Sequence, residues 1–156
     1  MPSFRTTRRV PHSPSDMFDL VADVDKYPQF LPLCQALKVR RREEGKGGRT
    51  IVVADMTVAY KVFHETFASR VTLDKPKLSI LVEYLDGPFS HLENRWTFKE
   101  DGKGGCVVEF FIDYTFRSRT LGFLVGSMFD AAFRRFAEAF ERRADVIYGK
   151  PAALTG

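Results

Sequence analysis

The stretch TLGFLVGSMFDAAFRRFAEAFERRADVIY, residues 120–148, determines the fold expected for this chain. On a period of about 3.6 residues its apolar side chains fall on one arc. This set comprises Leu121, Val125, Phe129, Ala132, Phe133, Phe136, Phe140, Ala144 and Ile147. Charged residues occupy the opposite arc, where Arg134, Glu138 and Arg142 follow the i,i+4 spacing of a solvated face. The pattern stops at Gly149 and therefore predicts one long amphipathic helix that buries a column of phenylalanines.

The totals fit one globular domain. A chain of 156 residues buries a sizeable core, and we expect a single domain over residues 1–149 with a flexible tail at residues 150–156. Hydrophobic residues make up 44% and charged residues 28%, which is typical of water-soluble proteins. No apolar run approaches the roughly 20 residues of a membrane span, and the N-terminus lacks the apolar core of a secretory signal. We therefore expect a cytosolic protein.

The net charge limits the classes of partner, and the cysteine content argues against disulfides. The net charge of +4 and a pI near 9.2 favour anionic surfaces, either phospholipid or RNA. The clearest basic run is Lys38, Arg40, Arg41 and Arg42, which either meets phosphates or protects an edge strand from aggregation. No nucleic-acid-binding motif is present, so we expect no DNA partner and no specific RNA readout. Two cysteines are too few for a disulfide framework.

Strand and turn patterns fill the rest of the chain. Residues 4–10 predict a strand, Ser13-Pro14 opens a short helix, and residues 25–32 predict a second short helix interrupted by prolines. Further strands begin near residues 36, 50, 62, 78, 92 and 106, between turn clusters rich in glycine, proline and aspartate. We place a turn near residues 59–61, because residues 50–73 are long for one strand. The sequence thus predicts an α+β fold with seven antiparallel strands.

Alternation along these strands predicts an aromatic inner surface. Its members are Phe63, Phe67, Val71, Leu73, Leu92, Trp96, Phe98, Val108, Phe110, Ile112, Tyr114 and Phe116. Glu65, Asn94 and the Tyr114 hydroxyl are the polar groups on the same faces. Burying a carboxylate without a partner costs several kcal/mol, so Glu65 has a partner, meets water in a cavity or does not point inward.

Several motifs follow one another along the chain. They are Val21-Ala22-Asp23-Val24-Asp25, Tyr27-Pro28-Gln29-Phe30-Leu31-Pro32-Leu33-Cys34, Glu65-Thr66-Phe67, Asp86-Gly87-Pro88-Phe89, Trp96-Thr97-Phe98 and the ending Phe140 to Gly149. Together they resemble the coenzyme-Q-binding START-like family, whose bacterial relatives include the ribosome-association toxin and proteins labelled cyclase/dehydrase. The resemblance extends from about Phe4 to Gly149.

This resemblance implies a helix-grip (START/Bet v 1-like) fold, in which a curved seven-stranded antiparallel sheet wraps around the long C-terminal helix, with two short helices after strand 1. It also implies an apolar cavity that binds ubiquinone or a related isoprenoid lipid in support of respiratory electron transport, as a carrier or chaperone. The toxin branch leaves a ribosome-associating regulator of translation as the alternative. The absence of a presequence fits a bacterial homologue rather than a mitochondrial one.

The phenylalanine column is either a plain core stripe or the wall of a cavity; Gly122 and Gly126, on the same side of the helix, allow space or a close backbone approach. The resemblance favours the cavity. The candidate ligand-binding residues are Phe63, Glu65, Phe67, Tyr84, Asn94, Trp96, Phe110, Tyr114, Gly126, Phe129, Phe133, Phe136 and Phe140. Asn94, Tyr114 or Tyr84 is expected to supply a hydrogen-bond donor to the quinone head.

Phe123 and Leu124 lie off the main apolar arc near the helix start. With Phe89 they either form an apolar rim that touches a membrane surface, in which case the protein is peripheral on the inner membrane, or pack under the loop of residues 116–120.

Catalysis finds little support in the sequence. His12, His64 and His91 are scattered, and none lies at metal-ligand spacing with the cysteines. No nucleophile elbow or phosphate-binding glycine loop is present. Glu65 with Tyr114 is the only acid–base pair on offer. We therefore expect a binding protein that is not an enzyme, with no metal or cofactor and with ubiquinone as its bound ligand.

Overall fold

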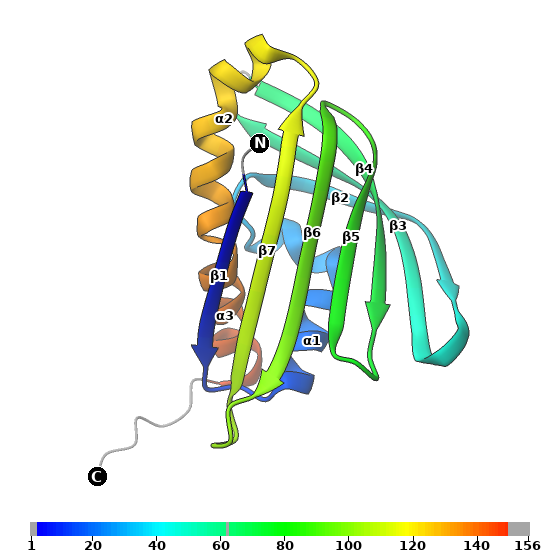
Figure 1. Cartoon of the computed structure of the whole chain (residues 1–156), viewed down its shortest axis with the longest axis vertical. Helices are drawn as coiled ribbons and strands as arrows, with labels where there is room; N and C mark the ends of the chain where they lie inside the picture. The colour runs from blue at the N-terminus through cyan, green and yellow to red at the C-terminus, as the bar shows by residue number, and fades with distance from the viewer. Residues whose placement is uncertain (1–2, 62, 150–156) are drawn as a thin grey trace.

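One antiparallel sheet curves around the C-terminal helices in the computed structural model, which describes residues 3–61 and 63–149 (Figure 1). Its seven strands are ordered β1-β7-β6-β5-β4-β3-β2. They are β1 (Ser3–Val10), β2 (Cys34–Glu44), β3 (Arg49–Tyr60), β4 (Phe63–Asp74), β5 (Ser79–Asp86), β6 (Phe89–Glu100) and β7 (Cys106–Phe116). The predicted α+β helix-grip architecture is confirmed, including the division of residues 50–73 into two strands. The expected tail at residues 150–156 lies outside the described residues.

Two short helical elements separate β1 from β2. Helix α1 (Pro14–Ala22) begins as its sequence predicts, with the Ser13 hydroxyl accepting a hydrogen bond from the Asp16 N–H at 3.1 Å. The 3₁₀ helix η1 (Val24–Gln29) contains Pro28, which limits it to a short tight element. A further 3₁₀ turn, η2 (Lys46–Gly48), joins β2 to β3.

The long C-terminal helix consists of two segments, α2 (Arg119–Arg134) and α3 (Phe136–Tyr148). They meet at Arg135, whose N–H donates to the Ala132 carbonyl at 3.0 Å in a tight turn of 3₁₀ type. None of the helices among the described residues is both long and apolar enough to cross a membrane.

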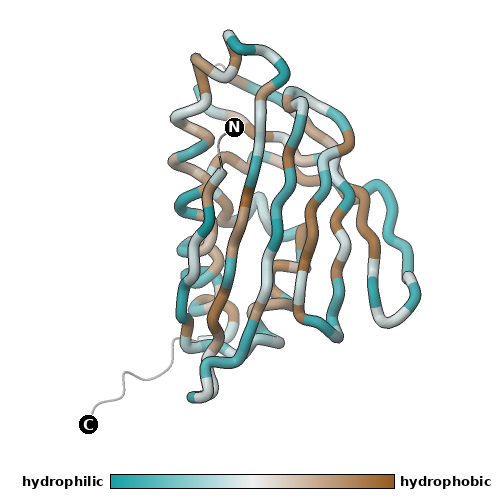
Figure 2. Tube along the Cα trace, viewed as in Figure 1, coloured by the Kyte–Doolittle hydropathy of each residue, from teal (hydrophilic) through white to brown (hydrophobic). Residues whose placement is uncertain are grey.

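Irregular pairing bends the sheet toward the helices. Register shifts occur in β2 between Cys34 and Ala36 and between Val39 and Arg41, and again in β4–β5 and β6–β7. Such bulges increase the local bend and twist of a strand. Hydrophobic and hydrophilic residues alternate along the strands (Figure 2), and along β7 every second side chain from Cys106 to Tyr114 is buried. The sheet therefore presents one continuous apolar face to α2 and α3.

Candidate ligand-binding cavity

A cavity of about 80 Å³ lies between the sheet, η1 and the two C-terminal helical segments. Its wall is predominantly apolar. The lining residues are Val24, Tyr27, Leu31, Pro32, Leu33, Leu37, Ala54, Met56, Val58, Phe67, Ser69, Val71, Val82, Leu92, Asn94, Trp96, Ile112, Phe129, Ala132, Phe133, Phe136 and Phe140. Phe140 closes one end, where its ring lies 5.1 Å from those of Trp96 and Phe30 and 5.2 Å from that of Tyr27.

Few polar groups reach this wall, and most are already bonded to the protein. Asn94 donates from Nδ2 to the Phe111 carbonyl at 2.8 Å and accepts at Oδ1 from the Trp96 indole N–H at 2.9 Å. The Tyr27 hydroxyl donates to the Val21 carbonyl, and burial raises the pKa of Tyr27, with Cys34 adding to the effect. Ser69 is buried and adds a hydroxyl to the lining. The cavity therefore selects for apolar bulk with at most a small polar head.

Part of the predicted ligand-binding set lines this cavity. These residues are Phe67, Asn94, Trp96, Phe129, Phe133, Phe136 and Phe140. Of the three predicted donors to a quinone head, only Asn94 is among them. Whether these side chains contact a ligand stays a prediction.

Glu65 does not point into the cavity, and this part of the site prediction is wrong. It pairs with Val58 across β3–β4 and shares that residue's face of the sheet, yet Glu65 is exposed while Val58 is buried and lines the cavity. Glu65 lies near the start of β4, where solvent reaches the inner face, so its carboxylate keeps its hydration and needs no buried partner. Neither Glu65 nor Tyr114 lines the cavity, and Glu65 is exposed whereas Tyr114 is buried.

Tyr114 and Phe110 are buried behind the cavity wall rather than in it. The Tyr114 ring packs 5.0 Å from Phe133, and burial, with a contribution from Asp130, raises the pKa of Tyr114 to about 12. The Phe110 ring lies 4.7 Å from Trp96 and supports it from the β1 side, where Phe4 packs against it. Both aromatic rings position lining residues without facing the cavity.

The remaining predicted residues also lie elsewhere. The Tyr84 hydroxyl accepts a hydrogen bond from the Phe89 N–H at 3.1 Å, next to the β5–β6 turn. Phe63 packs edge-to-face on Phe129 at 5.7 Å and faces a neighbouring groove. At Gly126 an added Cβ would meet no atom within 4 Å, so the space beside this glycine is open, and Gly126 lines a separate groove with Tyr114 and Phe116.

Of the predicted apolar rim, Phe123 and Leu124 are exposed as expected, whereas the prediction is wrong for Phe89; contact with a membrane stays a prediction. Phe89 is 0% exposed and stacks on Phe116 at 4.9 Å, because the tight turn before it directs the ring into the core. Gly87 makes that turn possible: its φ is +142°, and a Cβ there would lie 2.5 Å from the Cβ of Phe67. Phe123 and Leu124 are exposed and do not pack under the loop of residues 116–120.

Sequence reasoning missed one wall of the cavity. This wall comes from η1, the connection after it and the start of β2, and comprises Val24, Leu31, Pro32, Leu33 and Leu37. Opposite them, β3 contributes Ala54, Met56 and Val58 at alternate positions. The signal was present in both places: an apolar run within the Tyr-Pro-x-Phe-Leu-Pro motif, and period-two alternation along β3.

A groove of about 870 Å³ adjoins the cavity and shares Pro32, Leu33 and Ala132 with it. It runs along α2 and reaches the β3–β4 turn. Its other lining residues are Tyr60, Lys61, Phe63, Leu121, Leu124, Val125, Ser127, Met128, Ala131 and Arg135. The shared residues place the groove directly beside the cavity wall.

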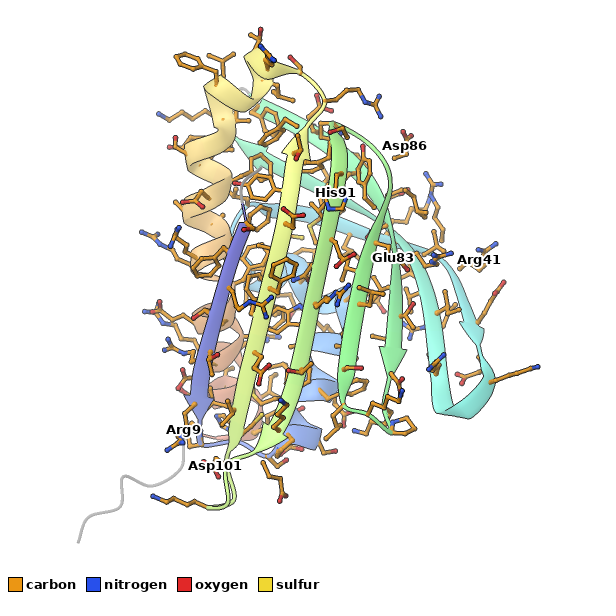
Figure 3. The ribbon with its side chains drawn as sticks, in the orientation of Figure 1. Arg9, Arg41, Glu83, Asp86, His91 and Asp101 are labelled. Atoms are coloured by element: carbon orange, nitrogen blue, oxygen red, sulfur yellow. The ribbon has the colours of Figure 1, made fainter. Side chains whose placement is uncertain are left out.

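The three histidines lie in separate pairs. His12 Nε2 lies 2.7 Å from Asp145 Oδ1, and His91 Nε2 lies 3.1 Å from Asp113 Oδ2 on the strands β6 and β7 (Figure 3). His64 contacts Gln35 at 2.6 Å. Within residues 3–61 and 63–149, no group of three or more His, Cys, Asp or Glu side chains is arranged to hold a metal ion.

The fold and the apolar cavity define a START-like, helix-grip protein. A family model described as polyketide cyclase / dehydrase and lipid transport matches residues 10–141, and the chain belongs to this family.

Three proteins are similar to this chain over most of its length. The ribosome association toxin RatA of Escherichia coli (strain K12) is 32% identical over 95% of this chain and 90% of the toxin. The mitochondrial coenzyme Q-binding protein coq10 of Schizosaccharomyces pombe is 29% identical over 92% of this chain and 87% of that protein. The solution structure of an 18 kDa protein from Caulobacter crescentus is 33% identical, with a TM-score of 0.77, and the match covers 96% of this chain and 100% of that one.

Proposed function

We propose that this protein binds a hydrophobic ligand between its sheet and C-terminal helices, and that this ligand is ubiquinone or a related isoprenoid quinone. In this role it supports respiratory electron transport as a carrier or chaperone. The observation that carries the proposal is an apolar cavity that shares wall residues with a largely apolar groove. The similarity to a coenzyme Q-binding protein over most of both chains adds support.

The ligand requires the cavity to expand. A volume of about 80 Å³ is well below the roughly 300–1,000 Å³ of ordinary ligand sites, and below the roughly 150 Å³ that admits benzene. We infer that helix α2 moves to make this room, because the three side chains that it buries, Phe129, Ala132 and Phe133, all line the cavity. The break at Arg135 allows α2 to move while α3 keeps its own contacts, such as the packing of Phe140 on Trp96 at 5.1 Å.

The head and the tail of the quinone have different places in this arrangement. The ring enters beside Asn94 and Ser69, where the few polar groups of the wall lie. The prenyl tail follows the groove along Leu121, Val125 and Met128. Each buried CH₂ contributes about 0.8 kcal/mol, so the tail supplies most of the affinity.

Organic extraction of the purified protein, followed by mass spectrometry, tests the proposal. The native protein is expected to carry a quinone, and Phe136→Asp is expected to lose it, because a carboxylate in the cavity wall excludes the ring. Val146→Asp places the same charge on an exposed position of α3 and serves as the control. A folded Phe136→Asp protein that keeps its quinone, or a native protein that never carries one, contradicts the proposal.

The second candidate function is association with the ribosome, which the similarity to RatA proteins favours. The basic run on edge strand β2 gives this function little support, because its arginines are already paired with carboxylates. Arg40 pairs with Asp55 at 2.6 Å, Arg41 with Glu43 at 3.3 Å and Arg42 with Asp25 at 4.0 Å. Sedimentation with ribosomal subunits at moderate salt tests this function. Binding to any RNA that disappears as salt rises indicates phosphate attraction alone.

A further inference from the structure

Four exposed large apolar side chains lie at one end of the molecule, apart from Val146, Ile147 and Tyr148 at the end of α3. Phe123 is 89% exposed and Leu124 68%, both in the first turns of α2. Leu85 near the β5–β6 turn is 49% exposed, and Tyr60 at the β3–β4 turn is 44% exposed. These turns lie together at the end of the molecule where α2 begins (Figure 1). We call Tyr60, Leu85, Phe123 and Leu124 the apolar tip.

The side chains of the apolar tip are not part of the hydrophobic core. Leu121 and Val125 of α2 are partly buried toward the sheet, whereas Phe123 and Leu124 between them point away from it. A single exposed leucine on a surface needs no explanation, but four large apolar side chains from α2, β3 and β5 at one end indicate an interaction surface.

Cations outnumber acids around the apolar tip. Lys61 follows Tyr60, and Arg117 and Arg119 lie in the connection from β7 into α2; all three side chains are exposed. The acidic neighbours are Asp86 on the β5–β6 turn (Figure 3) and Glu65 near the start of β4. Protruding apolar side chains combined with lysine and arginine are the pattern that binds anionic phospholipid surfaces.

The groove opens at the same end. Tyr60, Lys61 and Leu124 belong both to this end and to the wall of the groove that leads to the cavity. A flat protein partner would require a continuous surface, whereas these side chains come from three separate elements, α2, β3 and β5. Continuity with the groove and the surrounding cations therefore select a bilayer as the occupant.

We propose that the apolar tip docks on an anionic phospholipid bilayer, with Phe123 and Leu124 at the boundary between headgroups and acyl chains and with Lys61, Arg117 and Arg119 among the headgroup phosphates. Docking places the mouth of the groove against the membrane, so a prenyl chain passes between bilayer and protein without crossing water. The purpose of docking rests on the proposed function; the docking itself needs no ligand.

Vesicle co-sedimentation of the full chain tests the proposal, using phosphatidylcholine vesicles with and without phosphatidylglycerol. The native protein is expected to bind the anionic vesicles more tightly. Replacing Phe123 and Leu124 together by Ser is expected to weaken binding about tenfold or more, because two inserted side chains lose their burial. The matched control replaces Val146 and Ile147 by Ser; both are exposed apolar side chains near the C-terminal end of α3.

A second pair of variants tests the charge. Arg119→Gln is expected to weaken binding to anionic vesicles about fivefold, as one basic residue near such a surface contributes about 1 kcal/mol. Lys103→Gln, in the exposed β6–β7 turn, is expected to have no effect.

Three outcomes overturn the proposal: no vesicle binding by the native protein, equal loss in the Phe123/Leu124 and control variants, or self-association in solution that the Phe123/Leu124 replacement abolishes. Vesicle binding by a protein that never carries quinone leaves docking in place and refutes the ligand instead.

Discussion

Filling the cavity is expected to raise stability and abolish ligand binding at once. Ala54 is buried on β3, lines the cavity and pairs with Ser69 across β3–β4. Ala54→Ile adds three carbon atoms to the cavity, in a residue type that suits a strand. An empty volume of about 80 Å³ at about 24 cal/mol per Å³ corresponds to about 2 kcal/mol of lost stability. The variant is therefore expected to gain up to about 2 kcal/mol in free energy of unfolding.

Urea denaturation followed by tryptophan fluorescence measures this gain. Trp96 is the single tryptophan of the chain, and it is buried in the cavity wall, so its emission reports unfolding of the region concerned. For a domain of this size each kcal/mol shifts Tm by about 2–4 °C. Quinone content after organic extraction gives the second readout and is expected to fall to background.

Ala59→Ile is the matched control. Ala59 lies on the same strand but pairs with His64 on the opposite face of the sheet, so the same added volume leaves the cavity unchanged. An Ala54→Ile protein that is destabilised by more than about 1 kcal/mol would show that the rings leave no usable space. One that is stabilised yet retains quinone as the native protein does would place the ligand elsewhere.

Three further predictions follow from contacts outside the cavity. Replacing Ser13 by Ala removes the N-cap of α1 and is expected to lower the free energy of unfolding by about 1 kcal/mol in urea titrations. Replacing His12 by Ala leaves Asp145 without its 2.7 Å contact and is expected to cost about 2 kcal/mol by the same measurement, with Asp145→Asn showing a smaller loss. Burial raises the pKa of Cys34 and Cys106 from 9.0 to about 11, so the unfolded chain ionises first and stability is expected to fall as pH rises from 9 to 11. The folded protein is likewise expected to resist a thiol reagent at neutral pH; rapid labelling there would contradict the burial of both thiols.

Local patterns were sufficient for the architecture. The 3.6-residue period places Phe129, Phe133 and Phe140 on the buried face of the C-terminal helices, and period two places Trp96 and Ile112 on the inner face of the sheet. These signals are strong because each buried face repeats over many residues. The break at Arg135 left no such signal, since arginine continues the amphipathic pattern across it.

The cavity was harder to predict than the fold. Alternation assigns Glu65 to the inner face correctly, but it does not say where along β4 the helices cease to cover that face. Phe89 follows a turn whose direction depends on the close approach of Gly87 to Phe67, a tertiary contact. The wall formed by η1 and the connection after it was not predicted, because its apolar run lies in irregular backbone, which has no period from which Leu31 or Leu33 can be assigned to the cavity side.

The pairing of β1 with β7 has a consequence for how the chain folds during synthesis. Ser3 lies opposite Asp113 and Val10 opposite Cys106. The first strand to leave the ribosome, β1, therefore cannot pair until the last strand, β7, has been synthesised. Closing so long a loop is entropically costly and delays folding. A nascent chain that stops before Phe116 has an unpaired leading strand, and truncation from the C-terminal side is expected to yield no partially native intermediate that retains β1.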